Sequence, residues 1–203
     1  MIELRVLELL CARFCHEMVS PVGAINNGVE LLSEEDQDFV RDAIGLIGQS
    51  ARSASKRLQF YRFAYGTTPT AANATPKELL LGLLEGGKVS ADWSDALSRL
   101  PPEWLRVGCN LAVVAAETLP RGGKISLRPA QGAAPGVAIE AAGETVLINP
   151  DVVTALGGAV PAADLTSRTI QAHVTAEFAK ELGGSTRLKE SSATRALFVA
   201  APR

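Results

Sequence analysis

Apolar residues in the first third of the chain recur every three or four positions, which is the spacing of one face of an α-helix. One such run ends at the charged turn 33–36, and a second run continues to Tyr65, before Gly66, a residue typical of helix ends. The pattern predicts a helical hairpin over residues 1–66. The positions expected on its apolar stripe are Leu4, Leu7, Cys11, Phe14, Met18, Pro21, Ile25, Gly28, Leu32, Val40, Ile44, Ile47, Ala51, Ala54, Leu58, Tyr61 and Tyr65.

The two predicted helices carry apolar faces that are too wide for the helices to cover each other. A hairpin of this kind is buried by packing against another hairpin, and a second copy of the chain can supply it. We therefore expect a homodimer whose two hairpins form a four-helix bundle. In the alternative, the second half of the same chain covers the hairpin, and the protein is a monomer.

The rest of the chain mixes helical and strand periodicities. Residues 67–75 form a polar linker, and Thr75-Pro76-Lys77-Glu78 is a capping box that opens a helix. The pattern predicts an α/β sandwich over 76–203, so the whole chain is expected to be α+β. Helices are predicted at 76–85, 101–119, 150–156 and 167–182, and strands at 88–93, 124–128, 136–141, 145–148, 186–189 and 195–200.

The composition and charge of the chain exclude some classes of binding partner. The chain has 203 residues, a formal net charge of −2 and no long basic run, which argues against nucleic acid as the main partner. No segment approaches the roughly 20 apolar residues of a membrane span. The N-terminus mixes Glu and Arg with leucines, unlike a signal peptide. We expect a cytoplasmic protein that does not bind membranes.

The three cysteines do not suggest a disulfide framework. Cys11 and Cys15 lie four apart on one predicted helix and could share a metal ion with His16. Adjacent helical positions point about 100° apart, however, and no fourth ligand is evident. Small apolar cysteines packed in the helix seam are the favoured interpretation, with no metal bound.

His16 and Glu17 are the candidate chemical groups of the hairpin. An imidazole is a nucleophile that can carry a phosphoryl group, and a neighbouring carboxylate can orient it or accept its proton. At about 100° per residue, His16 lies opposite the apolar seam, on a small polar face that Ser20, Gly23 and Asn27 continue. Pro21 removes a backbone hydrogen bond, which predicts a kink, or alternatively a helix break, just after His16.

This pattern resembles the catalytic core of two-component histidine kinases. The hairpin resembles their dimerisation and histidine phosphotransfer domain, and residues 76–203 resemble their GHKL ATP-binding domain. Asn110-Leu111, followed by the segment 119–125, is similar to the N-box helix and its next strand. Residues 176–185 are similar to the helix before the family's Gly-Gly turn.

The chain departs from the kinases at their nucleotide-binding positions. Val114 stands where a second Asn would hold Mg²⁺, and the segment 140–144 has Ala where an Asp would bind adenine. The segment 164–169 lacks the glycines of the second phosphate-binding loop. The resemblance therefore implies a degenerate GHKL domain that does not bind ATP and has no cofactor of its own.

The whole chain resembles the ChpT-type histidine phosphotransferase family, most specifically over residues 10–32 and 53–66. This implies a dimer that takes a phosphoryl group from the receiver domain of a hybrid histidine kinase. It passes the group to receivers of response regulators such as CtrA and CpdR, and the receiver supplies Mg²⁺. His16 would carry the phosphoryl group and Glu17 would orient or deprotonate its ring. Arg13 and Ser20 would lie near the phosphoryl group, and the docking surface would include Val22, Gly23, Asn26 and Asn27, with Ile25 and Val29 either there or in the bundle core.

Two other functions stay open from the sequence. One is an ATP-dependent histidine kinase, against which the missing nucleotide-binding residues speak. The other is a non-catalytic dimeric adaptor that binds receivers without transfer, against which the outward position of His16 speaks.

Overall fold

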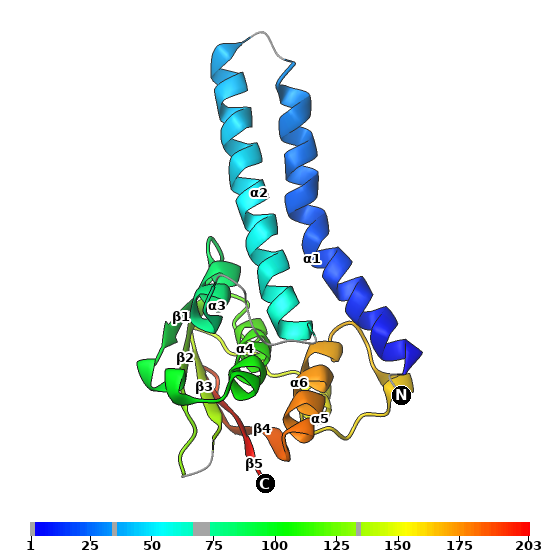
Figure 1. The fold of residues 1–203 in the computed structure, drawn as a ribbon, viewed down its shortest axis with the longest axis vertical. Coiled ribbons are helices and arrows are strands. Elements are labelled where there is room, and N and C mark those ends of the chain that lie inside the picture. Colours follow the sequence, from blue (N-terminus) through cyan, green and yellow to red (C-terminus); the bar gives the residue numbers. More distant parts are fainter. Residues whose placement is uncertain (1–2, 34–35, 67–73, 133–134) are drawn as a thin grey trace.

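A computed structural model of the protein describes residues 3–33, 36–66, 74–132 and 135–203. Helices α1 (Leu4–Leu31) and α2 (Gln37–Tyr65) form an antiparallel hairpin that projects as a rod from an α/β sandwich (Figure 1). The hairpin helices therefore lie where the apolar periodicity predicts them. Within the described ranges, no helix combines the length and apolar character that crossing a membrane requires.

The two hairpin helices lie close together at Gly28. A Cβ atom added to Gly28 would lie 2.6 Å from Cγ1 of Ile47, so glycine is required for this approach. Pro21 is buried inside α1, which continues through it without a break, so the alternative of a helix break is wrong. The N-terminal half of α1 leans away from α2 (Figure 1), as expected where proline removes a helical hydrogen bond. Lower in the hairpin, Phe14 meets Tyr61 edge to face at 5.7 Å between ring centroids.

The sandwich contains one five-stranded sheet in the order β1-β2-β3-β5-β4. The parallel pair is β1 (Val89–Trp93) with β2 (Gly123–Pro129), and the remaining pairs are antiparallel. The other strands are β3 (Val137–Ala142), β4 (Gly184–Ser191) and β5 (Arg195–Pro202). The predicted closing hairpin is thus present as β4 and β5.

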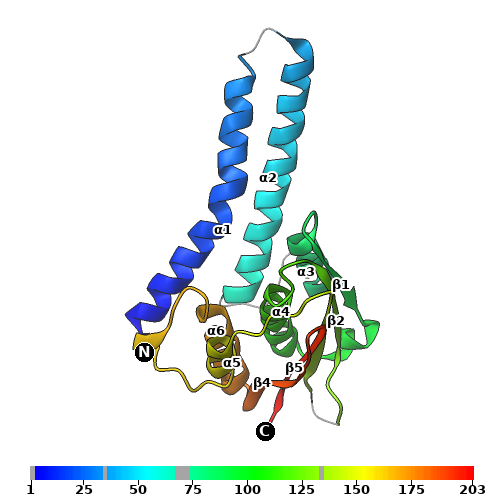
Figure 2. The ribbon, with the colours of Figure 1, turned by 180° about the vertical axis from the view of Figure 1, so that it is seen from behind.

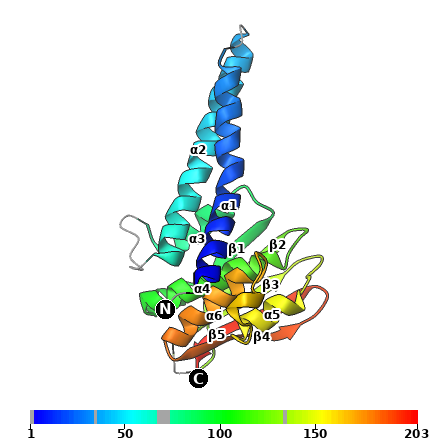
Figure 3. The same ribbon diagram turned by 90° about the vertical axis from the view of Figure 1, so that its right-hand side faces the viewer.

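Helices cover the sheet on the side that faces the hairpin (Figures 2 and 3). They are α3 (Pro76–Leu84), α4 (Pro102–Glu117), α5 (Pro150–Leu156) and α6 (Ile170–Glu181). The buried side chains Ile125, Leu127 and Ile139 of the sheet share one core with α4, whose inner face is almost entirely apolar. Helices α3, α4 and α6 also contact the hairpin, so these three helices join the halves of the molecule.

One predicted strand is wrong. Residues 145–148 form a loop, because their backbone groups bond to two different segments instead of to one strand. The N–H of Val146 donates to the carbonyl of Ala193 at 2.8 Å, whereas that of Leu147 donates to the carbonyl of Thr118 at 2.9 Å. Alternating hydrophobicity alone does not distinguish such a loop from a strand.

Part of the predicted apolar stripe is exposed in the single chain. Leu4 is 70% exposed, Leu7 50%, Ile44 59% and Leu58 46%. Cys11 and Cys15 are also exposed, so the expectation that they pack in the seam is wrong for one chain. The sandwich contacts both hairpin helices, but these side chains lie outside those contacts and stay uncovered.

A buried polar network fastens the hairpin to the sandwich. The side-chain amide of Asn110, fully buried on α4, donates to the carbonyls of Ala64 at 3.2 Å and Arg106 at 3.0 Å. Its oxygen accepts a hydrogen bond from Nε2 of Gln171 on α6 at 2.9 Å, and the hydroxyl of Tyr65 donates to the other end of Gln171. Burial raises the pKa of Tyr65 to about 12, so this hydroxyl keeps its proton. The network links α2, α4 and α6.

Replacing Asn110 by alanine should destabilise the fold. The change removes the two donors of the amide and leaves Nε2 of Gln171 without its best acceptor, in a site closed to water. Unpaired buried polar groups of this kind cost about 2 kcal/mol of unfolding free energy. Urea unfolding followed by circular dichroism measures the loss, and Asn26→Ala, on the exposed side of α1, is the control. Equal stability of the two variants would contradict the structural role of Asn110.

Candidate functional site

His16 lies on α1, exposed to solvent, beside the junction of the hairpin and the sandwich. Its side chain lines a cleft of about 550 Å³, here called the histidine cleft. One wall of this cleft comes from α1 and the other from α4, α5 and the connection between α5 and α6. The lining residues are Ala12, Arg13, His16, Glu17, Glu117, Asn149, Val152, Ser167 and Arg168.

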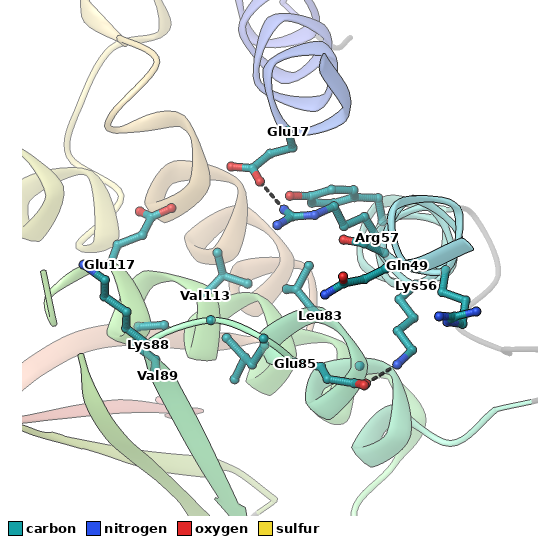
Figure 4. A pocket seen from close by; sticks show the side chains of 18 of the residues that line it. Glu17, Gln49, Lys56, Arg57, Leu83, Glu85, Lys88, Val89, Val113 and Glu117 are labelled. Atoms are coloured by element: carbon teal, nitrogen blue, oxygen red, sulfur yellow. Dashed lines mark hydrogen bonds and ion pairs between the residues drawn. The ribbon is translucent and has the colours of Figure 1, made fainter. Parts of the chain in front are cut away.

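Glu17 is held by an arginine of the neighbouring helix. Its carboxylate accepts a hydrogen bond from Nη1 of Arg57 on α2 at 2.5 Å, and both side chains are 30% exposed (Figure 4). The pair fixes where the carboxylate next to His16 lies. Sequence reasoning missed Arg57, because the antiparallel register of α1 and α2 brings it to Glu17 and no local motif marks it.

Arg13 joins α1 to the end of α4. Its guanidinium forms an ion pair with Glu117, and the Arg13 side chain is only 12% exposed. Burial lowers the pKa of this guanidinium, but the adjacent Glu117 carboxylate outweighs burial and the pKa is raised overall. Arg13 thus lines the histidine cleft, but its positive charge is already paired with the carboxylate of Glu117.

A second cleft of about 600 Å³ lies on the other side of this ion pair, between α2 and the connection from α3 to β1 (Figure 4). Arg13, Glu17 and Glu117 line both clefts and form the wall between them. Figure 4 shows Lys56 of α2 directed at Glu85, with which it forms an ion pair across the second cleft. Ion pairs therefore cross the junction both in the wall, between Arg13 and Glu117, and across the second cleft.

The predicted docking residues lie on α1 beyond His16. Ser20, Val22, Asn26 and Asn27 are exposed and Gly23 is half-buried. They can be reached by another protein, and their role in docking stays a prediction.

The positions expected to have lost nucleotide binding are filled by core packing. The amide of Asn110 is engaged inside the protein as described above, and Val114 on the next helical turn is 1% exposed. Ala141 lies fully buried in β3, paired with β2 and β5. Among the described residues, no group of three or more His, Cys, Asp or Glu side chains is arranged to hold a metal ion.

Comparison with known proteins gives concordant matches. A family model described as the histidine phosphotransferase C-terminal domain matches residues 74–194. The protein phosphotransferase ChpT of Brucella abortus (strain 2308) is 33% identical over 180 residues, which cover 86% of this chain and 85% of that protein. A solved structure of a bacterial phosphotransferase superposes with a TM-score of 0.78 at 30% identity and covers 98% of this chain and 97% of its own.

Proposed function

This chain belongs to the histidine phosphotransferase family and is a ChpT-like phosphotransferase of phosphorelays. On that premise, we propose that His16 carries the phosphoryl group between the aspartates of receiver domains. The observation that carries the proposal is the position of His16. Its imidazole is exposed at the mouth of a cleft, beside a carboxylate whose place is fixed by Arg57.

The reaction divides into two transfers with the same geometry. A ring nitrogen of His16 attacks the phosphorus of an aspartyl phosphate, the P–O bond to the aspartate breaks, and a free carboxylate leaves. In the second transfer a carboxylate of another receiver attacks phosphohistidine and the P–N bond breaks. Glu17 orients the ring or accepts its proton, while the receiver supplies Mg²⁺ to neutralise the phosphoryl oxygens.

Phosphoryl flow through this protein does not use ATP in our proposal. Support comes from the sandwich, in which Asn110 bonds to Ala64 and Gln171 and Val114 is packed in the core. Neither side chain is available to hold Mg²⁺ and phosphate, and without such groups ATP phosphoryl transfer has no electrostatic support.

The working form is a homodimer in this proposal. Exposed apolar side chains remain on both hairpin helices, at Val29 on α1 and at Ile44 and Leu58 on α2. Ile44 and Leu58 are two heptads apart, so they lie on one face of α2, as in the seam of a helical bundle. The donor is the receiver of a hybrid histidine kinase, and the acceptors are receivers of CtrA-like and CpdR-like regulators. These receivers dock on α1 around Val22, Gly23, Asn26 and Asn27, and Ser20 lies beside the phosphoryl group.

The test compares two sources of labelled phosphate. The protein is mixed with a ³²P-labelled receiver of a hybrid kinase and, separately, with γ-³²P-ATP and Mg²⁺. Label should pass from the receiver to the protein and then to a second receiver, and none should come from ATP. Labelling by ATP would contradict the proposed loss of nucleotide binding. A complex with receivers that never carries label would show an adaptor instead.

A further inference from the structure

The histidine cleft has a second wall that belongs to the sandwich, and Arg168 projects from it. Arg168 lies in the connection between α5 and α6 and lines the same cleft as His16. We infer that Arg168 is a catalytic residue that contacts the phosphoryl group on phosphorylated His16. The inference rests on the proposed function and adds a residue of the second domain to it.

The charges of the cleft single out this arginine. Two carboxylates line it, Glu17 and Glu117, and each is matched by one arginine, Arg57 or Arg13. Among the residues that the structure describes, Arg168 makes no ion pair. A phosphoryl group on His16 brings further negative charge next to these carboxylates, and an arginine can bind its oxygens through two parallel N–H groups. Arg168 is the cation of the cleft that remains uncommitted before the phosphoryl group arrives.

The segment that carries Arg168 is anchored on both sides. Leu165 and Ile170 are almost completely buried, in a small core that also contains Leu9 of α1. Nη2 of Arg5 on α1 donates to the carbonyl of Leu165 at 3.3 Å. The anchoring contacts come from the helix that bears His16, so they set the position of Arg168 relative to His16.

A local turn holds the backbone of this segment. The N–H of Thr166 donates to the hydroxyl of Thr169 at 2.9 Å, and the N–H of Ile170 donates to the carbonyl of Thr166 at 3.0 Å. None of these bonds uses the side chain of Arg168, which is exposed. The turn therefore fixes the point on the backbone from which the Arg168 side chain extends at the cleft. Because its side chain makes none of these bonds, Arg168 can be replaced without disturbing the turn.

The test uses a phosphoryl donor that has no protein surface. With phosphoramidate, a ring nitrogen of His16 attacks phosphorus, the P–N bond of the donor breaks and ammonia leaves. The rate of phosphohistidine formation is measured by phosphate-affinity electrophoresis for the wild type, Arg168→Ala and Arg168→Lys. After the donor and divalent ions are removed, the decay of phosphohistidine is followed in each protein. Arg128→Ala on β2 and Arg187→Ala on β4, both exposed arginines that do not line the histidine cleft, are the matched controls.

Arg168→Ala should slow phosphohistidine formation about tenfold, as expected when one charged contact to the transferred group is lost. Arg168→Lys should recover part of that loss, phosphohistidine decay should change in both variants, and both controls should behave as the wild type. Formation and decay in Arg168→Ala at the wild-type rates would overturn the inference. If transfer from a receiver were slowed in that same variant, Arg168 would belong to the receiver-docking surface instead.

Failure of the proposed function gives a different result. In that case phosphoramidate does not phosphorylate His16 of the wild type. The wild type and His16→Ala would then show the same phosphorylation on the gel. That outcome would overturn both the function and the inference. Wild-type label on His16 with no effect of Arg168→Ala would overturn only the inference.

Discussion

Replacing His16 by alanine should abolish phosphoryl transfer while leaving the fold intact. In the proposed mechanism the imidazole is the nucleophile of the first transfer and the leaving group of the second, so no other group can take its place. Loss of a nucleophile lowers rates by many orders of magnitude, and we expect a decrease of at least about a thousandfold, to background. His16 is exposed, and alanine is a strong helix former, so α1 should keep its stability.

Transfer from a labelled receiver, read by autoradiography, measures this loss. His173→Gln is the matched control, because His173 is the other histidine of the chain. It lies on α6, where burial lowers the pKa of its imidazole, and it does not line the histidine cleft. The control should transfer at the wild-type rate. Persistent labelling of His16→Ala would disprove His16 as the carrier. Loss of label in His173→Gln would show that His173 of α6 is needed for transfer.

Glutamates at Val29 and Ile44 should separate the proposed dimer into monomers. Val29 is 53% exposed and Ile44 59% exposed in the single chain, so each chain can accommodate the carboxylates in water. In a four-helix bundle formed by two hairpins, four carboxylates would instead be buried without partners. Each uncompensated charge costs several kcal/mol, so we expect the dimer dissociation constant to rise at least about a thousandfold.

Light scattering coupled to size exclusion measures the mass at micromolar concentration, and circular dichroism measures helix content. Leu147→Glu is the control, since Leu147 is 61% exposed on a loop of the sandwich and far along the chain from the hairpin. The control should stay dimeric. A double variant that remains dimeric with unchanged helix content would place the interface elsewhere, and a wild type of monomeric mass would remove the four-helix bundle from the proposal.

The sequence predicted well those elements whose hydrogen bonds join residues a few positions apart. The capping box that opens α3 is present, with the Glu78 carboxylate accepting from the N–H of Thr75 at 2.7 Å and the Thr75 hydroxyl accepting from the N–H of Glu78 at 3.2 Å. The mistaken strand at 145–148 shows the opposite case. Its alternating residues resemble a strand, but a strand exists only where a neighbour pairs with it, and the neighbours of this segment are Thr118 and Ala193.

The sequence by itself determined the two long helices and the outward direction of His16. A helix turns about 100° per residue, so an apolar stripe on one face assigns every other position to a side. The resemblance of the sequence to histidine kinases also indicated which nucleotide-binding residues of the kinases are replaced, because a residue's identity can be read without coordinates. The elements that periodicity could predict are those with interactions between residues a few positions apart.

Only the tertiary structure decided which charges meet around His16. Glu17 meets Arg57 across the hairpin, Arg13 meets Glu117 across the junction, and Arg168 reaches the cleft from the sandwich. These partners are 40 and 104 residues apart in the two ion pairs, and no local pattern encodes such a meeting. The pairing of these charges follows from the antiparallel register of α1 with α2 and from the packing of α4 and α6 against the base of the hairpin. Both are properties of the folded chain as a whole.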